Sequence, residues 1–171
     1  MDRILIEGGT PLYGTLAISG SKNAVLPLMV AGLLTDQPVT LRGTPRLADT
    51  RTLASVLREL GAEVEEFGSG PGEGLRVHAQ DLSSVRAPYE LVSKMRASFW
   101  VLGPLLARAR KAEVSLPGGC AIGTRPVDLY LSGLSKMGAD IAVEGGYVIA
   151  AARGGLKLSL IHISEPTRRL N

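Results

Sequence analysis

The only cysteine of the chain, Cys120, lies in a glycine-rich stretch that runs Ser115-Leu-Pro-Gly-Gly-Cys-Ala-Ile-Gly-Thr-Arg-Pro-Val-Asp-Leu129. Glycines at this density let a loop move and bring its backbone close to a ligand. Free cysteine is more often a small buried hydrophobic residue, but a thiol near fixed cations is placed for chemistry. The flanking glycines, and Arg125 five residues later, favour a chemical role for Cys120.

A second candidate group, Lys22 and Asn23, directly precedes the continuous apolar segment 25–34. This segment predicts a buried helix with Ser21 or Asn23 as its N-cap. Lys22 and Asn23 would then lie at a helix N-terminus, where free N–H groups and the helix dipole favour an anion. A simple polar cap explains the same residues, so these residue types alone do not establish an anion site.

The elements expected around these residues repeat once along the chain. The first copy reads helix, strand, helix, strand, strand, over Val25–Leu34, Val39–Arg42, Thr52–Leu60, Ala62–Phe67 and Leu75–Ala79. Asp49 or Thr50 is expected to cap its second helix, which Gly61 ends. The second copy has the same order, over Ser93–Ala109, Glu113–Leu116, Pro126–Met137, Ala139–Glu144 and Tyr147–Ala151. A unit used twice does not bury its apolar face alone, so further copies are expected.

The segments outside the two copies have different characters. Arg3–Glu7 and Thr15–Ser19 read as short strands, and Leu82–Pro88 reads as a polar connector. From about Leu158 the pattern fails, and the run from Ser159 to Arg169 resembles translated sequencing-adapter sequence. We therefore expect residues 158–171 to be a non-native tail.

Composition limits the function classes. The 171 residues are 45% apolar and 20% charged, which suits a soluble globular chain. Aromatic content of 4% and a net charge of +3 argue against nucleic acid as a partner. The longest apolar runs are about half the length of a membrane span. A single cysteine and an N-terminus unlike a signal peptide favour the reducing cytoplasm. No residue cluster has metal-ligand spacing.

Several motifs in order closely resemble the UDP-N-acetylglucosamine 1-carboxyvinyltransferases, a family of enolpyruvyl transferases. The resemblance runs from residue 1 to about residue 157. The motifs are Ser21-Lys-Asn-Ala24, Pro45-Arg-Leu-Ala-Asp49, Arg96-Ala-Ser98 with Trp100, Leu102-Gly-Pro-Leu105 and Pro117–Leu129.

This resemblance implies an α/β fold, the inside-out α/β barrel built from βαβαββ units. On the family pattern, residues 1–20 are strands of a second domain. Residues 21–157 are two of the three repeats of the first domain. The fold would thus be truncated in this chain.

The resemblance also implies a reaction, in which phosphoenolpyruvate adds to the 3-hydroxyl of UDP-N-acetylglucosamine and phosphate is then eliminated. Cys120 matches the family's proton donor, which also bonds to phosphoenolpyruvate or fosfomycin. The remaining matches are substrate contacts, with no cofactor or metal implied. Lys22, Asn23 and Arg125 match phosphate contacts, and Arg96 matches a UDP-sugar contact. The segment that begins at Arg125 matches the one along which the uridine part lies; its other residues are Pro126, Val127, Asp128 and Leu129.

Three other interpretations remain. The sister enzyme that acts on shikimate 3-phosphate shares the repeat, but is not expected to carry the Cys120 loop. A non-catalytic anion-binding module would leave Cys120 without a role. The third is an incomplete gene model with no role of its own. The family's candidate general base lies in the later half of its members, so we expect the 171-residue chain alone to be inactive.

Overall fold

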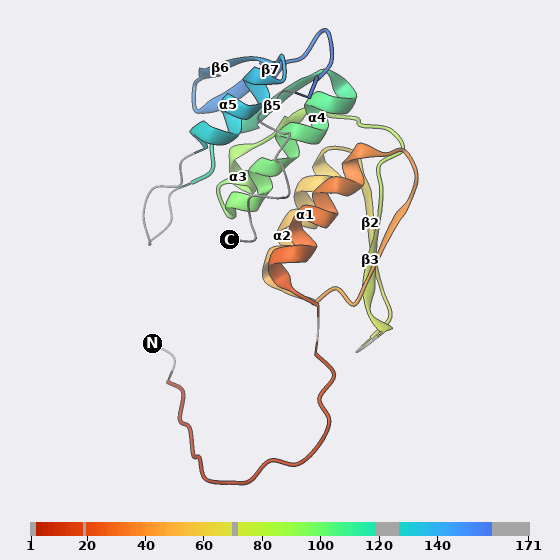
Figure 1. The fold of residues 1–171 in the computed structure, drawn as a ribbon, viewed down its shortest axis with the longest axis vertical. Helices are drawn as coiled ribbons and strands as arrows, with labels where there is room; N and C mark the ends of the chain where they lie inside the picture. Colours follow the sequence, from red (N-terminus) through yellow and green to blue (C-terminus); the bar gives the residue numbers. More distant parts are fainter. Residues whose placement is uncertain (1–2, 19, 70–71, 119–126, 159–171) are drawn as a thin grey trace, which may run out of the picture.

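The computed structural model describes residues 3–18, 20–69, 72–118 and 127–158. Two units follow one another in these residues (Figure 1). The first comprises α1 (Lys22–Ala31), η1 (Gly32–Leu34), β1 (Val39–Arg42), α2 (Ala48–Glu59), β2 (Glu63–Phe67) and β3 (Gly74–His78). The second comprises β4 (Arg86–Ala87), α3 (Tyr89–Val92), η3 (Arg96–Val101), α4 (Leu102–Ala109), β5 (Lys111–Ser115), α5 (Asp128–Lys136), β6 (Asp140–Glu144) and β7 (Tyr147–Ala151). The predicted repeat of the helix and strand order is confirmed.

Each unit has its own sheet, and most helices lie between the two sheets (Figure 1). The first sheet has the order β1-β3-β2 and is antiparallel, with Val77 opposite both Val39 and Val64. The second has the order β4-β5-β7-β6, in which β4 runs parallel to β5. Val64 and Val77 are buried while their neighbours along the strands are exposed or half-buried, so one face of the first sheet packs on the helices.

A shared apolar core joins the two units. In the first unit α1 contacts α2, and both helices also contact η3 of the second unit. The largest fully buried side chains are Phe99, Met29, Leu33, Leu53, Leu57, Leu60, Leu102, Leu105 and Leu106. Because they come from both units, the units fold against one another rather than as separate bodies.

The expected single helix from Ser93 to Ala109 is wrong: this range holds two helical pieces, η3 and α4, and it begins where the preceding helix α3 ends. Ser93 is the C-cap of α3, and Met95 is extended with φ −155° and ψ 128° before η3 begins. Pro104, in the first turn of α4, has no N–H to donate to the carbonyl of Trp100. The helical hydrogen-bond pattern therefore changes from 3₁₀ to α at this junction.

The start of α2 also differs from expectation. The helix begins at Ala48 with Leu47 as its N-cap, so Asp49 and Thr50 lie inside its first turn rather than at the cap position. Its end is as predicted, since Gly61 follows with φ +101° and donates its N–H to Arg58. Gly138 follows α5 in the same way, with φ +98°.

The segment 82–88 is more than a connector, because it contains β4. Ion pairing between Arg86 and Glu113, at 3.2 Å, joins β4 to β5. The Arg86 guanidinium also lies 4.9 Å from the ring centre of Tyr147 on β7. A strand of two residues is too short to show the alternation of apolar and polar residues that predicts a strand, so the sequence does not indicate β4.

The predicted strands Arg3–Glu7 and Thr15–Ser19 are wrong for this structure. Residues 3–18 contain no strand and extend away from both units (Figure 1); Ser19 falls outside the described residues. Their large apolar side chains are exposed, Ile4 by 85% and Leu12 by 92%. Strand-like alternation alone does not form a strand, because the backbone needs a neighbouring strand to bond with.

Candidate functional site

The N-terminal ends of α1 and α2 meet because the chain crosses itself just before each helix. The Gly20 N–H donates to the Gly43 carbonyl oxygen at 3.1 Å. A Cβ atom at Gly20 would overlap that oxygen, and Gly43 has φ +67°. Both positions therefore suit glycine, which allows close backbone approach and left-handed conformations.

Lys22 and Asp49 form an ion pair at this crossing. The Lys22 Nζ lies 3.0 Å from the Asp49 Oδ2, with side chains 52% and 38% exposed. Lys22 is the first residue of α1, so the prediction that it lies at a helix N-terminus is confirmed, as it is for Asn23. Ser21 is the N-cap residue, although its side chain makes no capping hydrogen bond. The charge of Asp49 offsets the unfavourable placement of a cation at this helix end.

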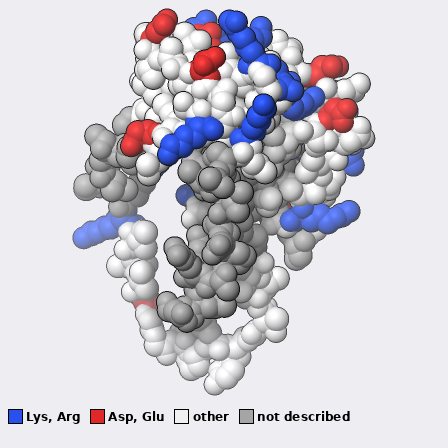
Figure 2. Space-filling model, turned by 45° about the horizontal axis from the view of Figure 1, so that its top comes forward, with Lys and Arg blue, Asp and Glu red and all other residues white. Residues whose placement is uncertain are grey.

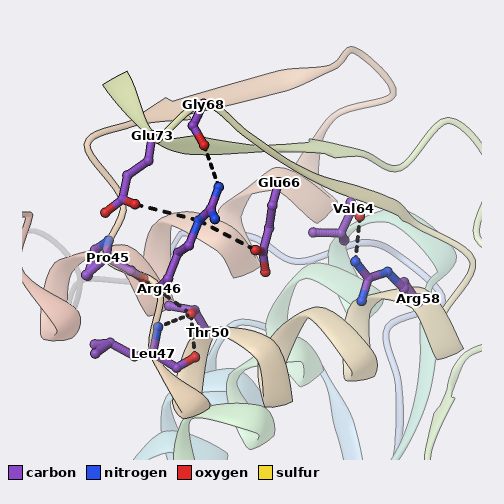
Figure 3. A network of polar contacts seen from close by, with 9 residues as sticks. All are labelled: Pro45, Arg46, Leu47, Thr50, Arg58, Val64, Glu66, Gly68 and Glu73. Atoms are coloured by element: carbon purple, nitrogen blue, oxygen red, sulfur yellow. Dashed lines mark hydrogen bonds and ion pairs between the residues drawn. The ribbon is translucent and has the colours of Figure 1, made fainter. Parts of the chain in front are cut away.

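Polar contacts hold the residues before and after Asp49 in the chain, as Figure 3 shows. The Arg46 Nη2 donates to the Gly68 carbonyl at 2.5 Å, and its Nε lies 3.6 Å from a Glu73 carboxylate oxygen. The Thr50 hydroxyl accepts from the Leu47 N–H at 3.1 Å. Arg46 thus fixes the segment to the β2–β3 hairpin, while Thr50 closes the first turn of α2.

The element η3, which begins at Arg96, lies between the elements that carry the other candidates. It contacts α1, and its Phe99 ring packs edge-on against the Tyr130 ring of α5, with centroids 5.9 Å apart. Arg96 itself is exposed. The structure therefore brings α1, which carries Lys22, into contact with η3, which carries Arg96. The Phe99–Tyr130 contact joins α5 to η3 as well.

Hydrogen bonds from the Tyr130 side chain join α5 to η3 and to the start of α4. Its hydroxyl accepts from the Gly103 N–H and donates to the Trp100 carbonyl, both at 3.2 Å. Burial raises the pKa of Tyr130 above its ordinary value of 10.0, and the Gly103 hydrogen bond partly offsets that rise. The hydroxyl is thus neutral and able to donate across the whole physiological range.

The described uridine-side candidates lie at the start of α5 and differ in burial. Val127 is its half-buried N-cap and packs against the core. Asp128 and Leu129 are its first two residues and are exposed, Leu129 by 84%. Cys120, Arg125 and Pro126 lie outside the described residues, so their roles stay predictions.

Two residues of this region gained roles that the sequence did not suggest. Asp49 lies in the Pro45–Asp49 motif, where the sequence predicts only a helix cap. Tyr130 has no signal of its own in the sequence, although Pro104 indicates a carbonyl that needs another donor. Its partner lies 30 residues away, at Trp100, which no local pattern indicates.

Charge on the described surface is mixed. On the face in Figure 2, basic side chains lie at several places with acidic side chains among them. In the described ranges, no group of three or more His, Cys, Asp or Glu residues could hold a metal ion. The helices of that same part of the chain are all too short or too polar to cross a membrane.

The family model described as EPSP synthase (3-phosphoshikimate 1-carboxyvinyltransferase) matches residues 6–167. The chain belongs to this family. The match passes Leu158 into residues that we expect to be a non-native tail. Those from 159 onward lie outside the described part, so that expectation stays a prediction.

Curated relatives share more than half of their aligned residues with this chain. UDP-N-acetylglucosamine 1-carboxyvinyltransferase from Rhodopseudomonas palustris (strain BisB18) is 54% identical over 98% of the chain, and the enzyme of that name from Nitrobacter winogradskyi is 55% identical over 92%. The chain spans only 40% and 38% of these two relatives.

Solved structures establish the fold. The enolpyruvyl transferase NikO from Streptomyces tendae aligns with 88% of this chain and 32% of its own, with TM-score 0.70 and 24% identity. EPSP synthase from Acinetobacter baumannii aligns with 80% of this chain and 31% of its own, with TM-score 0.56 and 18% identity. The fold is the inside-out α/β fold of the enolpyruvyl transferases, present here as part of a domain.

Proposed function

We propose that the protein to which this chain belongs transfers enolpyruvyl from phosphoenolpyruvate to the 3-hydroxyl of UDP-N-acetylglucosamine. The observation that carries this proposal is the 54% identity, over 98% of the chain, to an enzyme named for that substrate. The sister reaction on shikimate 3-phosphate has weaker support, because the solved EPSP synthases align at 17–18% identity.

In the proposed reaction, the Cys120 thiol gives a proton to C3 of the enol while the sugar hydroxyl attacks C2 and passes its own proton to a general base in the remainder of the protein. A base then takes a proton from C3 as the bond between C2 and the phosphate oxygen breaks, which releases phosphate and restores the double bond. Lys22, Asn23 and Arg125 hold the phosphate while its charge redistributes, because charge-assisted hydrogen bonds suit that task. Lys22 and Asn23 at the N-terminus of α1 support this assignment.

We assign the UDP-sugar to the segments at Arg96 and at residues 126–129. Support comes from the exposed side chains of Asp128 and Leu129 and from the Tyr130 contacts that join their helix to η3. The reaction needs no cofactor in this proposal.

The same proposal gives the chain its place in the whole protein. Residues 21–157 are two of three repeats of the first domain, and residues 1–20 belong to the second. The reaction would be the committed step of peptidoglycan synthesis in the cytoplasm. It would thereby serve cell-wall growth, cell shape and division, and would be a target of fosfomycin.

A hybrid enzyme tests the proposal. Residues 1–157 of this chain are followed by the corresponding remainder of the R. palustris relative, whose unmodified form is the positive control. We expect phosphate release only when both substrates are present, and its loss in Cys120→Ala. A hybrid that melts cooperatively yet binds phosphate without turnover would instead support the non-catalytic anion-binding module. Release by the 171-residue chain alone would overturn our expectation that it is inactive.

A further inference from the structure

The ion pair between Lys22 and Asp49 joins the first turns of two helices. Lys22 begins α1, while Asp49 is the second residue of α2. The 3.0 Å separation between ammonium nitrogen and carboxylate oxygen is a hydrogen-bonding distance. Both side chains remain partly exposed, so the ammonium stays accessible to a ligand.

Lys22 needs a partner if it is to hold one position. Its ammonium is a point charge on a flexible four-carbon stem, and the positive end of the α1 dipole repels it. Without a fixed acceptor the ammonium would sample solvent. Asp49 supplies that acceptor from a neighbouring helix.

Asp49 is itself well fixed. Thr50 closes the turn in which it lies, through the 3.1 Å hydrogen bond from the Leu47 N–H. Arg46 ties the preceding residues to Gly68 and Glu73 in the β2–β3 hairpin (Figure 3). An acid in the first turn of α2 also interacts favourably with the dipole of that helix. The Asp49 carboxylate thus projects from a backbone that contacts on both sides hold in place.

We propose that Asp49 is a positioning residue for Lys22, which holds the ammonium so that its remaining protons meet the phosphate group of the substrate. An ammonium has three N–H donors, of which one goes to Asp49 and two are left for an anion. This role rests on the proposed function, in which Lys22 contacts that phosphate.

The two effects of Asp49 on an anion oppose each other, and this gives the proposal a distinct signature. Its carboxylate orients Lys22, which favours turnover, but its negative charge repels the phosphate. Asp49→Asn removes the charge and weakens the hold on Lys22. We therefore expect phosphate to bind about two- to fivefold more tightly, as the strength of exposed charge pairs suggests. We expect kcat to fall about tenfold, because a small misplacement of a catalytic contact is costly.

The test measures turnover in the hybrid enzyme and inorganic phosphate binding by calorimetry in the 171-residue chain and in the hybrid. Glu59→Gln is the matched control, because it makes the same charge change at the exposed far end of α2. A double-mutant cycle with Lys22→Met then asks whether Asp49 acts through Lys22. In the Lys22→Met background, Asp49→Asn should have no further effect on kcat.

Two outcomes would overturn the proposal. One is an active hybrid in which Asp49→Asn matches Glu59→Gln in both kcat and phosphate affinity. The other is a tenfold loss from Asp49→Asn that persists beside Lys22→Met. A folded wild-type hybrid without turnover contradicts the proposed function instead, and the proposal then fails if Asp49→Asn binds phosphate no more tightly than Glu59→Gln.

Discussion

The hydroxyl of Tyr130 donates a hydrogen bond to the carbonyl oxygen of Trp100 at 3.2 Å, in the place where a helical N–H is missing. In a regular α-helix this carbonyl would accept from residue 104, which is proline here. The same hydroxyl accepts from the Gly103 N–H. One side chain of α5 therefore completes the backbone hydrogen bonding between η3 and α4.

Replacing Tyr130 by phenylalanine should destabilise the chain by about 1–3 kcal/mol, because a backbone donor and an acceptor lose their partner. Chemical denaturation measures the change. Trp100, the single tryptophan, reports on the same site by fluorescence. Tyr13→Phe is the control, since Tyr13 is 95% exposed. Equal stability of both variants would contradict a role for the hydroxyl.

The raised pKa of Tyr130 predicts a loss of stability at alkaline pH. Folding favours the neutral hydroxyl, so its contribution is fully present below the unfolded value of 10.0 and is lost as the pH rises through the higher folded pKa. The free energy of unfolding should therefore fall above about pH 10, with a shallower fall in Tyr130→Phe. Parallel pH profiles of the two proteins would count against this.

Local patterns predicted much of this fold and less of its site. The strand Val39–Arg42, the two hairpins and the glycines after α2 and α5 follow from short-range signals, and the structure confirms them. Lys22 and Asn23 at a helix start were predictable for the same reason. Residues far apart in the sequence decide the remainder.

The failures show which long-range contacts were missing from the sequence argument. The chain breaks before Arg96 at Met95, which is extended, and the hydrogen bonding at the Pro104 junction is completed by Tyr130 from a distant helix, so no helical period predicts either. Residues 3–18 alternate like strands but have no strand beside them. The partner of Lys22 became visible only once the crossing at Gly20 brought α2 to α1.

Two glycines in equivalent places should differ in their tolerance of alanine. Gly61 and Gly138 both have positive φ, which costs a residue with a side chain about 1–2 kcal/mol. A Cβ at Gly61 would also lie 2.6 Å from the Ser83 backbone nitrogen, whereas at Gly138 it has room. Thermal melts should rank Gly61→Ala as the more damaging. Gly133 lies inside α5, where an added Cβ would meet open space, so Gly133→Ala should raise the free energy of unfolding by about 0.5–1 kcal/mol. A smaller loss at Gly61 than at Gly138 would refute the steric argument.

Removal of the exposed N-terminal segment should leave the fold intact. Residues 3–18 expose several large apolar side chains. A chain starting at Gly20 keeps the hydrogen bond to Gly43 that aligns α1 with α2. We expect an unchanged free energy of unfolding and higher solubility, measured by denaturation and light scattering. A clear loss of stability would show that the segment packs on the units in solution.

Arg108 should contribute most to the contact between the two units. From α4 its Nη1 lies 3.1 Å from the Leu33 and Thr35 carbonyl oxygens and 2.5 Å from that of Ala79, and its Nη2 donates to Gln80. The Leu33 and Thr35 carbonyls lie at the end of η1, and the Ala79 and Gln80 carbonyls follow β3. One guanidinium therefore contacts two separate segments of the first unit.

Arg108→Met should therefore cost about 2–3 kcal/mol, because charged hydrogen bonds are lost and part-buried carbonyls are left without a donor. Arg108→Lys should recover only a fraction, since an ammonium lacks the planar fork that reaches several oxygens at once. Arg51→Met, on the exposed side of α2, controls for the loss of one positive charge. Urea denaturation followed by Trp100 fluorescence measures all three variants. Full recovery by lysine would mean that charge alone, and not the fork geometry, joins the units.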